Sequence, residues 1–199
     1  MDESLFKIYQ QQLSDEGLDP NSNASRDWFL DKMDEITNLD VDRNAMKAKQ
    51  KVASKFFIGK MYMFWYKPKL RIQLPYYDRF PLVILLDITK EGFLGLNLHY
   101  LPIDLRQKLY YTLLPRATTT EFGAVTRLKI DYKYLLGKTA LRAYKPCVKQ
   151  YLFKQVTGRM AFVPANEWEV AVHMPTAYFK KATESKVHKE SRIIARKNQ

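Results

Sequence analysis

The chain has 199 residues, of which 46% are hydrophobic, so it is long enough to bury the core of one sizeable domain. Its formal net charge of +12 favours a negatively charged partner: nucleic acid first, an anionic membrane surface second and an acidic protein third. There is no run of about 18 uncharged apolar residues and no signal-peptide pattern, so we expect a soluble, non-secreted protein with no membrane partner.

The charge is unevenly distributed along the chain. Residues 1–46 contain four basic and eleven acidic residues, a net charge of −7, whereas residues 47–199 contain 29 basic and ten acidic residues, a net charge of +19. A body with this surplus attracts polyanions at long range. The alternative is that the lysines serve only solubility, although mixed charges serve that purpose better.

Cysteine and histidine are too scarce for a familiar metal or disulfide framework. The single cysteine, Cys147, cannot form an internal disulfide, which fits a reducing cytoplasm, and three dispersed histidines cannot complete a zinc set with it. We expect Cys147 to be a small buried apolar residue and His99 to be a hydrogen-bonded structural residue. The seven glycines are dispersed, so no phosphate-binding loop is predicted, and we expect no cofactor and no metal.

Four segments follow from the pattern: an acidic arm (1–46), a basic, helix-prone connector (47–57), an α+β core (58–176) and a basic helix or tail (177–199). In the arm, a cap at Ser25 and apolar residues at helical spacing predict an acidic amphipathic helix over 27–39. Three placements remain open for this helix: on the core of its own domain, over the basic body, or against a neighbouring subunit.

Strands are predicted in the first half of the core. Residues 61–66 are β-prone and end at Lys67-Pro68, residues 81–88 are apolar on both faces, and residues 93–100 return after a turn at Gly92, which predicts a hairpin. With a short strand at 160–163, they give a small, mostly antiparallel sheet, for which we consider a barrel-like closure.

Helices are predicted to pack around this sheet. We expect them over 102–114, 146–156 and 164–174, and a strand running into a helix over 127–136. From about Ala177 we expect a helix that frays into a loose basic tail. The predicted fold class is α+β.

The stretch 59–80, GKMYMFWYKPKLRIQLPYYDRF, interleaves aromatic and cationic residues. In a strand Tyr62, Phe64 and Tyr66 share one face, and if exposed they would form a stacking surface for bases, flanked by cations. The alternative is a strand buried on both faces. In either case nine cationic residues and no acidic one lie between Asp42 and Asp78, which favours salt-dependent, sequence-independent phosphate contacts.

A metal-dependent nuclease is the enzymatic alternative for a basic protein with scattered carboxylates. It would use the acidic residues Asp78, Asp87, Glu91 and Asp104, which lack the spacing typical of restriction-type nucleases. We therefore expect no enzyme activity and no catalytic residue.

Residues 59–102 resemble a known family. GKMY (59–62), LPYYDRFP (74–81) and GFLGLNLHYLP (92–102) are similar to the tailed-bacteriophage DNA end protectors, a family related to the T-even-type head-completion protein. The resemblance covers about residues 58–176 and does not include the acidic arm. It implies a virion protein that associates with the packaged DNA terminus, protects it from a host exonuclease and helps to complete the head for tail joining.

We therefore expect a non-enzymatic virion protein that is also present in the host cytoplasm during assembly. Its expected partners are DNA, other phage proteins of the head–tail region and further copies of itself. The predicted DNA contacts are Lys60, Tyr66, Lys67, Lys69, Arg71, Lys180, Lys181, Lys189, Arg192, Arg196 and Lys197. The alternative is a neck, tail or baseplate subunit whose basic surface binds acidic protein partners instead of DNA.

Overall fold

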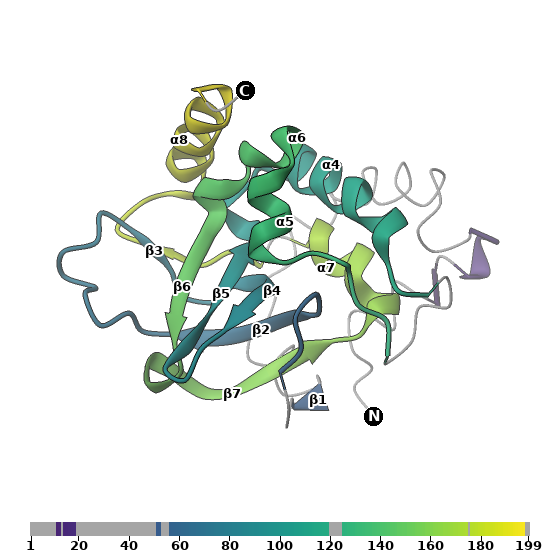
Figure 1. Ribbon diagram of the computed structural model, residues 1–199, viewed down its shortest axis with the longest axis horizontal. Coiled ribbons are helices and arrows are strands. Elements are labelled where there is room, and N and C mark those ends of the chain that lie inside the picture. The colour runs from purple at the N-terminus through teal and green to yellow at the C-terminus, as the bar shows by residue number, and fades with distance from the viewer. Residues whose placement is uncertain are drawn as a thin grey trace.

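The computed structural model describes residues 11–12, 14–18, 51–52, 56–119, 125–174 and 176–197, and it has a mixed α+β architecture (Figure 1). A six-stranded sheet carries helices on one face, and a second sheet has two strands. The helix predicted over 27–39 lies outside the described residues.

The large sheet is antiparallel at every pairing. Its strands, in spatial order, are β1 (Lys51–Val52), β7 (Val156–Val163), β2 (Met61–Tyr66), β4 (Leu82–Ile88), β5 (Gly92–Asn97) and β6 (Val148–Leu152). The predicted strand at 61–66 and the hairpin of β4 and β5 are confirmed, and the strand predicted at 160–163 is the second half of β7. In the helix-prone connector, residues 51–52 instead pair with β7 as a strand.

The sheet curls but does not close. β6 and β7 are consecutive in the chain, joined only by the turn Phe153–Gln155, yet they pair with β5 and β2 respectively, and no pairing joins them within the described residues. Register shifts between Met63 and Trp65 in β2 and between Leu85 and Asp87 in β4 bend these strands. A closed, barrel-like sheet is therefore wrong.

The curl buries both faces of the central strands. Tyr151 of β6 meets Phe64 and Tyr66 of β2, with ring centroids 5.1 and 4.9 Å apart, while Met61 and Met63 point to the opposite face and pack with the helices. The alternation of side chains is as predicted, and the alternative of a strand buried on both faces is confirmed. The exposed stacking surface, with Tyr66 as a DNA contact, is wrong. Because Tyr66 is only 7% exposed and Phe64 is fully buried, neither ring is open to a base.

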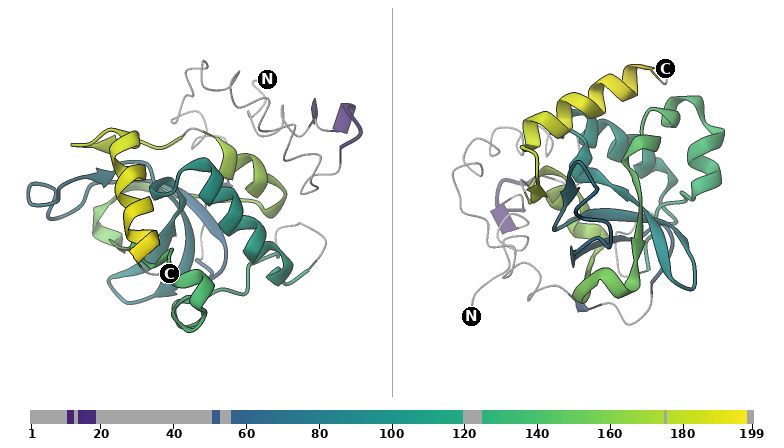
Figure 2. Two further views of the ribbon diagram at one scale, coloured as in Figure 1. Left: turned by 90° about the horizontal axis from the view of Figure 1, so that it is seen from above. Right: turned by 90° about the vertical axis from the view of Figure 1, so that its left-hand side faces the viewer.

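Helices lie over one face of the sheet (Figure 2), and within the described residues five α-helices contribute apolar side chains to the core cluster on that face. They are α4 (Ile103–Leu113), α5 (Tyr132–Gly137), α6 (Thr139–Arg142), α7 (Trp168–His173) and α8 (Glu184–Lys197). The helix predicted over 102–114 is confirmed as α4, since Pro102 precedes its first turn and Pro115 follows it. The helix predicted over 164–174 is confirmed as a short 3-10 turn followed by α7.

Three segments differ from their predicted form. The helix predicted over 146–156 is wrong, because residues 148–152 form the edge strand β6, whose pairing with β5 overrides the local helix propensity. The strand predicted before α5 is a single bridge between Ala117 and Leu128. The C-terminal helix begins at Glu184 and continues to Lys197, where the sequence predicts a loose tail.

A two-stranded sheet joins the centre of the chain to its C-terminal part. β3 (Tyr77–Asp78) pairs with β8 (Phe179–Lys180), and β8 leads into α8. Two basic segments that are about 100 residues apart in sequence therefore lie next to each other.

Candidate nucleic-acid interface

The basic loop, residues 67–75 between β2 and β3, projects from one end of the molecule (left in Figure 1). Proline at position 68 prevents β2 from continuing as a paired strand. The predicted contacts Lys67, Lys69 and Arg71 are all exposed on this loop, which contains no acidic residue. No salt bridge to these three cations occurs among the described residues, and the loop presents them to solvent.

The C-terminal segment fixes the basic loop. The Lys181 ammonium donates to the carbonyl oxygens of Ile72 and Leu74, at 2.7 and 3.0 Å, and the Tyr76 hydroxyl donates to Glu190 of α8 at 2.7 Å. Lys181 has a φ of 68°, a left-handed conformation that costs a non-glycine residue about 1–3 kcal/mol. The predicted DNA contact Lys181 therefore also anchors the loop.

Two lysines that are not among the predicted contacts lie beside the basic loop. Lys90, in the turn between β4 and β5, and Lys154, between β6 and β7, line a pocket of about 540 Å³ together with Lys69 and the acidic residue Glu91. We call Lys67, Lys69, Arg71, Lys90 and Lys154 the basic edge. Each lysine lies in a strand connection, but only the strand order reveals that these connections meet at the same end of the sheet.

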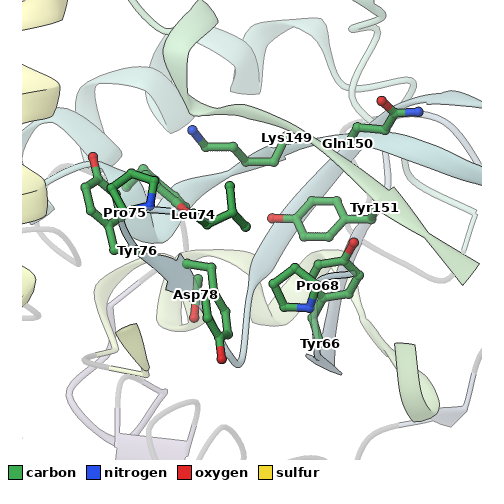
Figure 3. A pocket seen from close by; sticks show the side chains of 11 residues that line it. Tyr66, Pro68, Leu74, Pro75, Tyr76, Asp78, Lys149, Gln150 and Tyr151 are labelled. Atoms are coloured by element: carbon green, nitrogen blue, oxygen red, sulfur yellow. The ribbon is translucent and has the colours of Figure 1, made fainter. Parts of the chain in front are cut away.

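A second pocket, of about 330 Å³, lies at the base of the basic loop (Figure 3). Leu74, Pro75 and Tyr76 form one side of it, and Lys149 reaches over it from β6. The Lys149 ammonium lies 4.2 Å from the centroid of the Tyr100 ring, and burial lowers its pKa. No ion pair of Lys149 occurs in the described part of the chain.

Asp78 lines the same pocket and is almost fully buried. Its carboxylate accepts hydrogen bonds from the Phe80 N–H at 2.9 Å, the Asn97 side-chain amide at 3.1 Å and His99 Nδ1 at 2.8 Å. Burial by itself would raise the pKa of Asp78, but the interactions with His99 and the other donors outweigh it and lower the pKa. The pocket therefore contains a carboxylate whose charged form is stabilised by hydrogen bonds from its neighbours.

Asp78, His99 and Thr176 are arranged in the order of an acid, base and nucleophile. His99 Nε2 lies 2.9 Å from the Thr176 hydroxyl, and all three residues are at most 3% exposed, so they form a buried hydrogen-bonded network. Burial also lowers the pKa of His99, which favours the neutral imidazole. The structural role predicted for His99 is confirmed.

A second basic surface lies on α8. Val187, Ser191 and Ala195 recur at helical spacing and face the body, so the opposite side of the helix is exposed. That side carries four of the predicted contacts: Lys189, Arg192, Arg196 and Lys197. Arg192 forms an exposed ion pair with Asp104 at 2.9 Å, which partly compensates its charge.

Two predicted contacts, Lys60 and Lys180, pack against aromatic rings. Lys60 precedes β2, about 20 Å along the strand from the basic loop, and its ammonium lies over the rings of Phe57 and Phe162 at 5.0 and 4.9 Å. Lys180 is half-buried, 4.6 Å from the centroid of the Tyr178 ring. Lys60 therefore lies apart from the exposed cations of the loop, whereas Lys180, opposite Tyr77 in the β3–β8 pair, lies beside the base of the loop.

The carboxylates considered for a nuclease do not converge. Asp87 accepts a hydrogen bond from the next backbone N–H, Asp104 pairs with Arg192, and the described residues contain no group of three potential ligands that could hold a metal ion. Cys147 is buried, which raises its pKa to about 12 and confirms its prediction as a small buried residue. In the described ranges, no helix has the length and apolar character needed to span a membrane.

The amino-acid sequence matches a known protein family. Residues 3–196 match the family model of the phage T4 terminal DNA protecting protein, so the similarity reaches well into the acidic arm, beyond the 58–176 expected from the sequence motifs. Comparisons with curated proteins and with solved structures give no match. Since the match covers nearly the whole chain and agrees with the motifs at 59–102, the protein belongs to the phage T4 terminal DNA protecting protein family.

Proposed function

We propose that this protein binds the end of packaged phage DNA and shields it from exonuclease without catalysing a reaction. Its family is named for the protection of terminal DNA. The single observation that supports a direct DNA contact is the basic edge, where cations from three strand connections lie at one end of the sheet. Phosphates are the complementary partner for such a surface.

The proposed binding is electrostatic and independent of sequence. Each phosphate that a lysine or arginine neutralises releases condensed counterions, so affinity falls as salt rises. A protein held over the terminal base pairs also obstructs an enzyme that must enter from the end. Protection therefore requires occupancy of the terminus and no covalent chemistry.

The resemblance to head-completion proteins extends the proposal to the virion. We place the protein at the packaged DNA terminus, where it also contributes to head completion and tail joining through contacts with other head–tail proteins and with further copies of itself. It would be present in the host cytoplasm while particles assemble. Because most of the acidic arm belongs to the matched region, the protein used to test this function should be the full chain.

The test is binding of the full chain to a blunt duplex across a salt series. Five phosphate contacts from the basic edge give a slope of log K against log salt of about −4.5. A duplex saturated with protein should also survive digestion by an end-dependent exonuclease. Binding that is absent, or that does not change with salt, would contradict the proposal and favour a neck, tail or baseplate subunit that binds acidic proteins.

A further inference from the structure

The tip of the basic loop carries two exposed apolar side chains. Ile72 is 84% exposed and Leu70 is 54% exposed, and they alternate with the exposed cations Lys69 and Arg71. Large apolar residues are unfavourable in water, and at these exposures neither side chain is part of the core. Both therefore have the position expected of side chains that become covered by a partner.

Hydrogen bonds hold this tip in a defined conformation. The Gln73 and Leu74 N–H groups both donate to the Leu70 carbonyl oxygen at 3.0 Å, and the Arg71 N–H donates to the Pro68 carbonyl oxygen at 3.3 Å. With the Lys181 anchor, these bonds fix the backbone on both sides of Ile72. A preorganised loop loses less conformational entropy when it binds.

A DNA end differs from the interior of a duplex by the exposed face of its last base pair. That face is flat and apolar and is surrounded by phosphates, so it complements an apolar tip flanked by cations. In internal DNA, an apolar wedge must first separate two stacked base pairs, which costs free energy. At an end the outer face is already open, so the same side chains bind there without this cost.

On the basis of the proposed function, we propose that Leu70 and Ile72 cover the terminal base pair of the duplex while Lys67, Lys69 and Arg71 contact the neighbouring phosphates. The apolar pair distinguishes an end from internal DNA. The cations supply affinity that is the same for both. This division assigns end recognition to the basic loop and leaves the rest of the basic edge as a general DNA contact.

The experiment compares two DNA substrates with the same duplex sequence. One is a blunt linear duplex, and the other is a dumbbell whose ends are closed by hairpin loops that obstruct the terminal base pairs. The wild-type chain should bind the blunt duplex more tightly than the dumbbell. The double substitution Leu70→Ser and Ile72→Ser should lower affinity for the blunt duplex about tenfold, from the apolar area left uncovered, and leave affinity for the dumbbell unchanged.

The matched control is Val125→Ser, because Val125 is 80% exposed and lies outside the basic loop. This variant should keep the wild-type preference for blunt ends. Thermal unfolding of all variants checks that the fold is intact, as expected for substitutions at exposed positions.

Failure of this inference can be distinguished from failure of the proposed function. If wild type prefers blunt ends and the double variant keeps that preference, the role of Leu70 and Ile72 is overturned while DNA-end binding stands. An equal loss on both substrates also overturns it, because the tip would then contribute to general binding. If wild type binds neither substrate, both proposals are overturned.

Discussion

Asp78 connects three separate parts of the chain through one side chain. Besides Phe80 beside it on the chain, it binds Asn97 at the end of β5 and His99 in the following 3-10 turn, and it accepts a longer hydrogen bond of 3.3 Å from the Tyr178 N–H. These contacts hold the small sheet of β3 and β8 against the large sheet. Because β3 follows the basic loop and β8 leads into α8, Asp78 helps to hold the elements that carry the proposed DNA surface.

Replacing Asp78 by alanine should destabilise the protein by about 3–5 kcal/mol, because it leaves several buried donors without their acceptor. The free energy of unfolding in urea measures this effect. The control is Asp87→Ala on β4, where the carboxylate is exposed, and this change should remain within about 0.5 kcal/mol of wild type. Similar values for the two variants would show that the Asp78 network does not stabilise the fold.

Strands β5 and β6 approach each other closely because position 92 is a glycine, which has no side chain. A Cβ atom added to Gly92 would lie 1.9 Å from the carbonyl oxygen of Tyr151, which is backbone and cannot move without displacing β6. β6 also carries Lys149 and leads to Lys154. The spacing of these two strands therefore affects both the basic edge and the aromatic cluster of Phe64, Phe93 and Tyr151.

We expect Gly92→Ala to destabilise the protein by about 1–3 kcal/mol, the usual range for forcing extra volume into a packed site. Gly137 provides the control, since an added Cβ there meets no atom within 4 Å. Gly137→Ala, at the end of α5, should leave stability unchanged or raise it by up to about 1 kcal/mol. Chemical unfolding of both variants tests the prediction, and equal stability of Gly92→Ala and wild type would contradict the tight approach.

For the whole molecule, the arrangement of charge matters more than its total. The net charge of +12 includes lysines on α4, on α5 and in the connections near them, as well as those of the basic edge. Long-range attraction depends on all of them, but counterion release depends on the cations that contact phosphate. Two sets of substitutions with the same change in net charge can separate these contributions.

Neutralising four cations of the basic edge should weaken DNA binding much more than neutralising four elsewhere. The test variant changes Lys67, Lys69, Lys90 and Lys154 to glutamine, and the control changes the exposed residues Lys108, Lys129, Lys133 and Lys138 in the same way. Both have a formal charge of +8 in place of +12. The salt dependence should fall by about one unit of slope per lost contact in the first variant only. Equal slopes for the two variants would mean that net charge alone determines binding.

Part of the candidate site could be predicted from the sequence, because it depends on neighbours in the chain. Lys67, Lys69 and Arg71 follow a strand that Pro68 must end, so their exposure in a loop followed from local rules. Lys90, Lys149 and Lys154 could not be assigned to the site, because nothing in the chain around them shows which strands are neighbours. Tyr66 was misassigned for a related reason: alternation gives the face of a side chain but not what covers that face.

The α+β class, the β4–β5 hairpin, the motifs of the family and the surplus of positive charge after residue 46 can all be recognised in the amino-acid sequence. These properties depend on composition and on residues close together in the chain. Three other features are visible only in the folded chain: the sheet curls without closing, residues 148–152 form an edge strand, and Lys181 anchors the basic loop. Each of these depends on pairing between distant segments, whose free energy comes from burial and hydrogen bonds that no local pattern contains.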